Sequence, residues 1–262
     1  MSVRFLLCDA DGNLFPSEAP AFVASADVTN RFLDSLGVGV RYGAEQLRLA
    51  TTGKNFRTTA VDLALTHGVR LEPPLTPSPG VVPAGSTGTT LTADLMDRWL
   101  AEEKDVVSDH LGRVLSPDPA VLEPLTRLAG RHELALVSSS ALSRVDACLR
   151  ATGLADLFPP ERRFSAEDSL PRPTGKPDPA VYLHALDRLG TAAEVSLAVE
   201  DSLPGARSAV AAGLPTLGNL VFVPPDERAQ RRAELTDAGV LAVVSSWSDV
   251  EAALAAPELA LR

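Results

Sequence analysis

The sequence predicts an α/β fold: a parallel-sheet, Rossmann-like core with helices on both faces, plus an all-helical cap domain. From about residue 133 onward, short apolar runs alternate with helical patterns, as is typical of βαβ units and a parallel sheet. Residues 16–112 break that rhythm, because helical patterns follow one another there with no convincing strand. An all-helical insert between the first two strands indicates a separate cap.

The elements of the core follow from the positions of the apolar runs. Residues 5–8 form the first predicted strand, and Gly12 marks the turn after it. Further strands are predicted at 133–137, 195–199, 215–217 and 240–244, and helices at 142–152, 179–189, 203–213, 227–238 and 248–255. The predicted core is therefore residues 1–15 and 113–262.

The cap is predicted to hold helices and one long loop. Helical patterns cover residues 21–36, 44–50, 56–66 and 92–111. Between the last two, residues 72–90 are rich in Pro, Gly, Ser and Thr, so they bury little apolar surface and form no helix. We expect an exposed, mobile loop there.

Composition limits the possible partners. The chain has 262 residues, 45% of them hydrophobic, which is ordinary for a soluble globular protein. A formal net charge of −10 argues against a nucleic-acid partner. The densest basic cluster, around Arg228, Arg231 and Arg232, alternates with acidic residues and predicts a solvated helix face.

The sequence also limits the location. No stretch reaches the roughly 20 apolar residues that span a bilayer, and the N-terminus lacks a signal-peptide pattern. Cys8 and Cys148 stand far apart in apolar surroundings, so buried free thiols are expected. We therefore expect a cytoplasmic enzyme with no membrane partner, either a monomer or a homodimer.

The first strand ends in a pair of aspartates, Asp9 and Asp11. Residues i and i+2 leave a strand on the same face, so both carboxylates project together. Two like charges this close are costly unless a cation lies between them, and hard oxygen ligands suit Mg²⁺. The pair suggests magnesium-assisted phosphoryl chemistry; an ordinary Asp-rich turn is the alternative.

Polar residues follow other segments of the predicted core as well. They are found at 138–140, in the loop 174–177, and at 200–202. In open parallel sheets the ligand binds outside the carboxyl ends of the strands. We expect these groups to converge with the two aspartates.

In their order along the chain, these segments resemble a known family. Residues 9–14, 138, 175–179 and 200–205 are similar to the four motifs of the haloacid dehalogenase-like hydrolase superfamily. Residues 139–145, 152–154 and 164–168 resemble its β-phosphoglucomutase and sugar-phosphatase branch. The resemblance covers almost all of the core and, more loosely, the cap.

The resemblance implies roles for the aspartates of the first strand. Asp9 would be the nucleophile that forms an aspartyl-phosphate. Asp11 would act as general acid and then as general base. Mg²⁺ would be held by Asp9, by the backbone carbonyl of Asp11, and by Asp201, with Glu200 a second ligand or an orienting group. For Glu200 and Asp201 the alternative is the acidic first turn of a helix, which the helix dipole favours. That placement is compatible with a metal-binding role.

The same resemblance implies a phosphate site. The Ser138 hydroxyl and the backbone N–H of Ser139 would bind the transferring phosphoryl group. Lys176 would neutralise both that group and the nucleophile. For Ser138, the alternative is a helix N-cap.

In the cap, residues 51–57 resemble the substrate-specificity loop of the family. A turn at Gly53 would place Lys54, Asn55 and Arg57 against the non-reacting end of the substrate. A plain interhelix turn is the alternative. The chain departs from the family at Asn13, where threonine is usual, and at Pro16, where aspartate is frequent.

The expected function is a Mg²⁺-dependent phosphatase for a small phosphorylated metabolite, such as a sugar or polyol phosphate. The alternative is a phosphomutase that returns the phosphoryl group from Asp9 to a sugar hydroxyl. A non-catalytic phosphate-binding domain is disfavoured by the complete set of carboxylates and lysine. A phosphoryl site must admit substrate and exclude water, so hinges are expected near residues 15–17 and 111–117.

Overall fold

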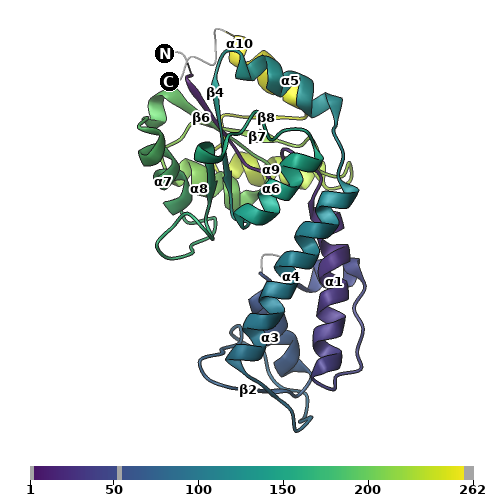
Figure 1. The fold of residues 1–262 in the computed structure, drawn as a ribbon. Coiled ribbons are helices and arrows are strands. Elements are labelled where there is room, and N and C mark those ends of the chain that lie inside the picture. The colour runs from purple at the N-terminus through teal and green to yellow at the C-terminus, as the bar shows by residue number, and fades with distance from the viewer. Residues whose placement is uncertain (1–2, 52–54, 257–262) are drawn as a thin grey trace. The chain divides into compact units, whose positions relative to one another are not determined.

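The computed structural model describes residues 3–51 and 55–256, which form two compact units (Figure 1). The core unit comprises the chain up to Ser17 and from Gly112 onward, and the helical unit comprises Glu18–Leu111. Among the described helices, none combines the length and apolar character needed to cross a lipid bilayer. Cys8 and Cys148 are buried free thiols, as predicted.

The core unit is built on a six-stranded parallel sheet, which confirms the predicted fold class. Its strand order is β5-β4-β1-β6-β7-β8. In chain order the strands are β1 (Phe5–Cys8), β4 (Glu133–Ser138), β5 (Arg163–Ser165), β6 (Ser196–Glu200), β7 (Thr216–Asn219) and β8 (Ala242–Val244).

The order of the strands reverses at β1, which pairs with β4 on one side and β6 on the other. Cys8, at the end of β1, lies opposite Leu136 and Val199, so the three strands end close to the same level. Such a reversal leaves a crevice at the carboxyl ends of the strands, where ligands of open α/β sheets bind. Asp9, Ser138 and Glu200 therefore lie at this edge.

Helices accompany the strands of the core unit. They are α5 (Pro119–Ala129), α6 (Leu142–Ala151), α7 (Ala180–Leu189), α8 (Leu203–Ala211), α9 (Arg228–Asp237) and α10 (Trp247–Ala255), with short 3₁₀ turns η1 (Pro160–Arg162) and η2 (Ala193–Val195). Helices α5 and α10 pack side by side (Figure 1).

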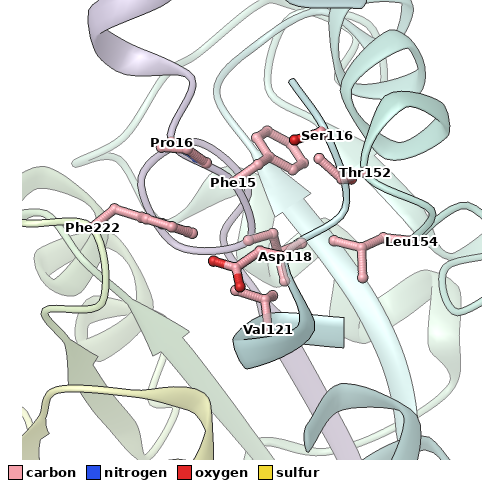
Figure 2. Close-up of a pocket in the computed structure, with 9 residues that line it drawn as sticks. Phe15, Pro16, Ser116, Asp118, Val121, Thr152, Leu154 and Phe222 are labelled. Atoms are coloured by element: carbon pink, nitrogen blue, oxygen red, sulfur yellow. The ribbon is translucent and has the colours of Figure 1, made fainter. Parts of the chain in front are cut away.

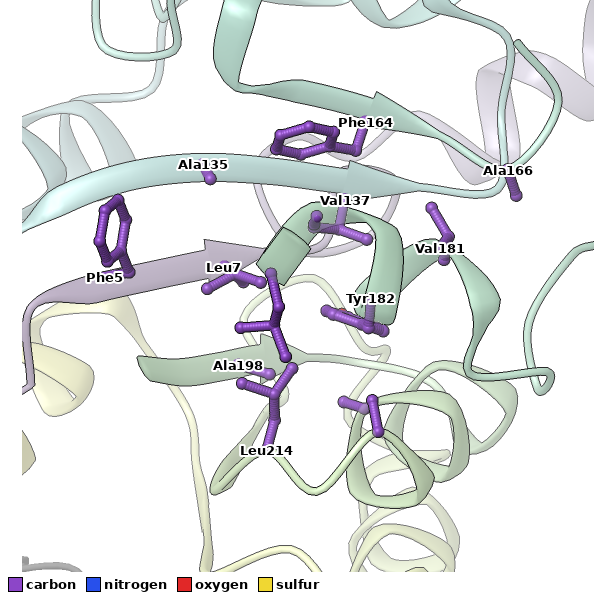
Figure 3. Packing of buried hydrophobic residues seen from close by; sticks show 14 residues of the cluster. Phe5, Leu7, Ala135, Val137, Phe164, Ala166, Val181, Tyr182, Ala198 and Leu214 are labelled. Carbon is purple, nitrogen blue, oxygen red and sulfur yellow. The ribbon is translucent and has the colours of Figure 1, made fainter. Parts of the chain in front are cut away.

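One face of the sheet packs against α7 and α8 (Figure 3). Leu7 of β1, Val137 of β4 and Ala198 of β6 are fully buried there with Tyr182 of α7. Fully burying a side chain such as Leu7 stabilises the fold by about 1.5–3 kcal/mol. Tyr182 also brings a hydroxyl into this layer, and a buried tyrosine hydroxyl usually finds a hydrogen-bond partner.

Two elements of the core unit were not predicted. Strand β5 has only three residues and lies at an edge of the sheet, so it leaves little pattern in the sequence. Helix α5 contains Pro124, which removes a backbone donor and disfavours a helix assignment. Its start is nevertheless typical, because Asp118 caps the helix and Pro119 follows in the first turn.

The helical unit contains α1 (Glu18–Ser35), α2 (Ala44–Thr51), α3 (Phe56–Thr66) and most of α4 (Ala93–Val114). Phe32 packs edge-to-face with Phe56 and Trp99 at its centre. The unit is not all-helical, because β2 (Arg70–Leu71) and β3 (Thr90–Leu91) form a parallel pair. Strands of two residues are too short to show an alternating pattern.

The long loop of the helical unit is largely exposed, as expected, but it is anchored to α3. The Asp62 carboxylate accepts hydrogen bonds from the backbone N–H and the hydroxyl of Ser78, both at 2.7 Å. Ala84 N donates to Thr66 O at 3.1 Å. The mobility of residues 72–90 stays a prediction.

Candidate active site

Lys176 connects the ends of the three central strands. Its ammonium group lies 2.5 Å from Asp9 Oδ1, after β1, and 2.7 Å from Glu200 Oε1, at the end of β6. It also donates to the carbonyl of Val137 in β4 at 2.9 Å. The three donors of the ammonium group thus have three acceptors, and the side chain is only 5% exposed.

Asp9, Glu200 and Asp201 form a buried cluster of carboxylates. One oxygen from each lies within 4.8 Å of the others. Burial raises the pKa of Asp9 to about 7, although Lys176 opposes this effect. Burial and the charges of Asp9 and Glu200 likewise raise the pKa of Asp201 well above its usual value. The cluster thus carries more negative charge than its surroundings readily stabilise.

The residues of this cluster fit a hard divalent cation. Glu200 Oε2 is buried and is one of the side-chain atoms without a hydrogen-bond partner in the described part of the chain. A Cβ at Gly12 would lie 2.3 Å from Asp201 Oδ2, and one at Gly205 would lie 1.9 Å from Glu200 Oε2. Because glycine has no Cβ at these two positions, the carboxylates of Asp201 and Glu200 can occupy that space. Carboxylate oxygens are ligands that suit Mg²⁺.

Asp11 lies outside this cluster and has partners of its own. Its Oδ1 accepts from the Ser17 hydroxyl and pairs with Arg144 at 3.2 Å, and its Oδ2 accepts from Ser140 Oγ at 2.7 Å. Burial acts to raise the pKa of Asp11, but Arg144 and the two hydroxyls outweigh it, so the pKa lies below its ordinary value. The sequence pattern of α6 did not single out Arg144.

The serines after β4 shape the neighbouring turn. Ser138 Oγ accepts from Ser140 N at 2.9 Å, and Ser139 Oγ accepts from Lys176 N at 3.4 Å. Ser138 is not the N-cap of α6, because Ala141 occupies that position. Instead the Asp168 carboxylate, from a distant segment, accepts from Leu142 N at 2.6 Å. A phosphate-binding role of Ser138 and Ser139 stays a proposal.

The residues expected to set specificity are only partly described. Gly53 and Lys54 lie outside the described residues. Asn55 is the N-cap of α3, and its side chain accepts from Thr58 N at 2.9 Å. Arg57 pairs with Asp97 of α4 at 2.5 Å, with both side chains exposed. Asn55 therefore has the structural role that an interhelix turn requires.

Besides Arg144, the sequence did not reveal the roles of Tyr182 and Asn13 at the site. The Tyr182 hydroxyl donates to Glu200 Oε1 at 2.6 Å, and its ring lies 5.1 Å from the ammonium group of Lys176. Asn13, noted only as a departure from the family, donates from its side-chain amide to Asp9 O at 3.0 Å and Val199 O at 3.1 Å. Tyr182 could have been noticed because it lies on the apolar face of α7, where a buried hydroxyl needs a hydrogen-bond partner.

The arginines of α9 lie on a helix that is largely exposed, as predicted, but each of them also donates to a backbone carbonyl. Arg228 donates to Val223 O at 2.9 Å, and Arg232 donates to Val243 O at 2.7 Å. Arg231 donates to the backbone carbonyl of Asp201 at 2.8 Å, which brings this helix to the carboxylate cluster. Alternating charges on the helix could not reveal these carbonyl acceptors.

A small pocket of the core unit is lined by residues other than those of the carboxylate cluster (Figure 2). Side chains from the turn after β1, including Leu14 and Phe15, line it together with Val121 of α5 and Leu154. Its acidic residue, Asp118, already accepts from Ala120 N at 2.9 Å as the cap of α5. The pocket is mainly apolar, and the candidate chemistry therefore rests on the cluster around Lys176.

The chain is similar to known proteins in both sequence and fold. A model of haloacid dehalogenase-like hydrolases matches residues 8–213. The plasmid protein CbbY of Cupriavidus necator is 42% identical over 85 residues, which are 32% of this chain and 32% of that protein. A haloacid dehalogenase-like hydrolase domain-containing protein of Arabidopsis thaliana is 32% identical over 124 residues, 46% of this chain and 37% of its own. The matches thus span about a third of these relatives.

Solved structures are similar over almost the whole chain. A haloacid dehalogenase family hydrolase of Deinococcus radiodurans, solved with bound phosphate and sodium, has a TM-score of 0.61 and 25% sequence identity to this chain. The match covers 97% of this chain and 95% of the Deinococcus chain. CbbY of Rhodobacter sphaeroides, as a variant with xylulose-(1,5)bisphosphate, has a TM-score of 0.63 and 22% identity, covering 94% and 96%. Since the family model spans most of the sequence, this chain belongs to the haloacid dehalogenase-like hydrolases.

Proposed function

We propose that this protein is a Mg²⁺-dependent phosphatase that hydrolyses a small phosphorylated metabolite, a sugar or polyol phosphate, through an aspartyl-phosphate. The observation that carries the proposal is the contact of Lys176 with both Asp9 and Glu200 beside Asp201. A fixed cation and a buried carboxylate cluster are what metal-assisted phosphoryl transfer requires. The phosphate bound to the Deinococcus relative supports the ligand class.

In this mechanism Asp9 is the nucleophile. One of its carboxylate oxygens forms a bond to phosphorus while the bond between phosphorus and the ester oxygen breaks. Asp11 gives a proton to the departing oxygen, then takes one from the water that attacks the aspartyl-phosphate and releases Asp9. Lys176 stabilises the negative charge on the transferring group, and Ser138 with the N–H of Ser139 binds its oxygens.

Mg²⁺ would be held by Asp9, Glu200, Asp201 and the backbone carbonyl of Asp11, and it would neutralise charge on the phosphoryl oxygens. The contacts of Asp11 with Arg144, Ser17 and Ser140 favour its ionised form. That form suits a base. Before Asp11 can donate a proton to the leaving group, it must therefore exchange some of these contacts.

A screen for phosphate release from sugar, polyol, nucleotide and glycolytic phosphates, with Mg²⁺ present, tests the proposal. Asp9→Asn should abolish turnover while the circular dichroism spectrum is kept. Asp118→Asn is the matched control, because asparagine caps a helix as well as aspartate does. Wild-type turnover by Asp9→Asn would contradict the covalent mechanism.

The same screen separates the two candidate activities and tests the metal. A phosphomutase would form an isomeric sugar phosphate with no net release of phosphate.

Chelation with EDTA should stop turnover and Mg²⁺ should restore it. Excess Ca²⁺ should inhibit, because its looser coordination disturbs the in-line geometry. Full turnover by metal-free protein would exclude the metal assignment.

A further inference from the structure

We propose that Arg231 is a positioning residue for Asp201 that keeps the carboxylate cluster assembled without metal and thereby weakens metal binding. The inference rests on the proposed metal site. It assigns a function to a residue of α9, a helix outside the four motifs that the chain shares with its family.

The guanidinium group of Arg231 is held between Asp201 and its own helix. Nη1 donates to Asp201 O at 2.8 Å and lies 3.9 Å from Asp201 Oδ2. On the other side, Nε lies 3.4 Å from Glu234 Oε2, one turn along α9. The Arg231 side chain is 24% exposed and that of Asp201 only 11%, so solvent screens this pair incompletely.

The three carboxylates of the site are paired with two cationic side chains. Lys176 contacts Asp9 and Glu200, and Arg231 contacts Asp201. Three buried carboxylates repel one another strongly when no metal lies among them. Arg231 therefore stabilises the third carboxylate of the cluster.

This arrangement has a definite effect on metal affinity. Arg231 attracts the carboxylate of Asp201 whether or not the metal is bound, but it repels the metal only in the loaded state. It therefore stabilises the metal-free site relative to the loaded one. Removing it also loses one hydrogen bond to Asp201 O, but we expect the repulsion between a unit charge and a divalent ion bound by the same carboxylate to be the larger effect.

The test compares Arg231→Gln with Arg232→Gln, its neighbour on α9, whose guanidinium contacts Val243 O instead. Binding of Mg²⁺, and of Mn²⁺ as a probe, is titrated calorimetrically in the absence of substrate. Arg231→Gln should bind either ion roughly tenfold more tightly than wild type. Arg232→Gln and the charge-conserving Arg231→Lys should stay within about twofold.

A second readout is thermal unfolding in EDTA. Metal-free Arg231→Gln should unfold at a lower temperature than metal-free Arg232→Gln, and Mg²⁺ should raise its transition more. If Arg231→Gln does not fold, Glu234→Gln gives the opposite test. That change leaves Arg231 in place without its surface carboxylate, so metal binding should weaken.

The outcomes separate this inference from the proposed function. If wild type binds no divalent ion, the proposed function fails. If wild type binds the ion and Arg231→Gln binds it no more tightly than Arg232→Gln, the role of Arg231 is overturned and the metal site stands. Weaker binding by Arg231→Gln would likewise overturn it, because the lost hydrogen bond would then exceed the charge effect.

Discussion

The side-chain amide of Asn219 donates a hydrogen bond to the side-chain oxygen of Asn13 at 3.0 Å, and both residues are fully buried. The amide of Asn13 in turn donates to Asp9 O and Val199 O, and Trp247 Nε1 donates to Asn13 O. A threonine hydroxyl, with one proton, could not donate to both carbonyls. The asparagine at this position thus connects the segment that follows β1 to β6, beside the carboxylates of Asp9 and Glu200.

A double-mutant cycle between these two asparagines should reveal strong coupling. Asn219→Leu leaves the Asn13 oxygen buried without its donor, and Asn13→Thr leaves the Asn219 amide without its acceptor. Each should lower the free energy of unfolding by about 1–3 kcal/mol. The double variant should lose clearly less than the sum, as measured by urea unfolding; simple additivity would contradict this network.

Tyr182→Phe should impair turnover with little change in packing. The substitution removes only the hydroxyl that donates to Glu200 Oε1, so Glu200 and Lys176 lose an orienting contact. A hydrogen bond to a charged group is worth about 1.5–3 kcal/mol, so a fall in kcat of at least tenfold is expected. Tyr42→Phe, which loses a hydroxyl contact to His67, is the control. Equal rates for both variants would assign Tyr182 to packing alone.

The stability of the metal-free protein should fall as the pH rises. The pKa of Asp9 is about 7 in the fold, above its ordinary 3.8, so the folded state binds the proton more tightly than the unfolded chain does. Its contribution is therefore complete below about pH 4 and is lost as the pH rises through about 7. Mg²⁺ should counter this loss, because it stabilises the ionised form.

Thermal unfolding at about pH 5.5 and about pH 8 measures this effect, with and without Mg²⁺. Asp9→Asn is the reference, because it removes the titrating group but retains the other carboxylates. In EDTA, the wild type should lose more stability than Asp9→Asn between the two pH values. The same loss in both proteins would show that Asp9 does not titrate in this range.

Arg57→Ala should change which ester is used more than whether phosphate is transferred. Binding energy remote from the reacting atoms helps to position a substrate, so kcat/KM for the preferred ester should fall by orders of magnitude. A small generic ester such as p-nitrophenyl phosphate should be affected little. Asp97→Asn, which removes the ion-pair partner but keeps Arg57, is the control. Equal losses on both esters would place Arg57 outside substrate selection.

Much of the core could be predicted because local periodicity determines it. The run Phe5–Cys8 is buried along its whole length, as its apolar residues predict, but Asp9 and Asp11 lie beyond the end of this strand, and Asp11 has partners of its own. The ends of parallel strands meet at one edge of a sheet, so Lys176 and Glu200 were expected near Asp9, and their contacts confirm this. Periodicity failed for short elements such as β5 and for α5, in which Pro124 interrupts the helical pattern.

Tertiary structure alone decided which partners complete these groups. Asp9 meets Lys176 across a sequence separation of 167 residues, and Asn13 meets Asn219 across 206. Nothing in the pattern of α9 shows that Arg231 reaches Asp201 rather than water. Local sequence determines the face on which a side chain lies, but its partner depends on how distant elements pack. The charges and hydrogen bonds that tune this site are therefore properties of the folded chain.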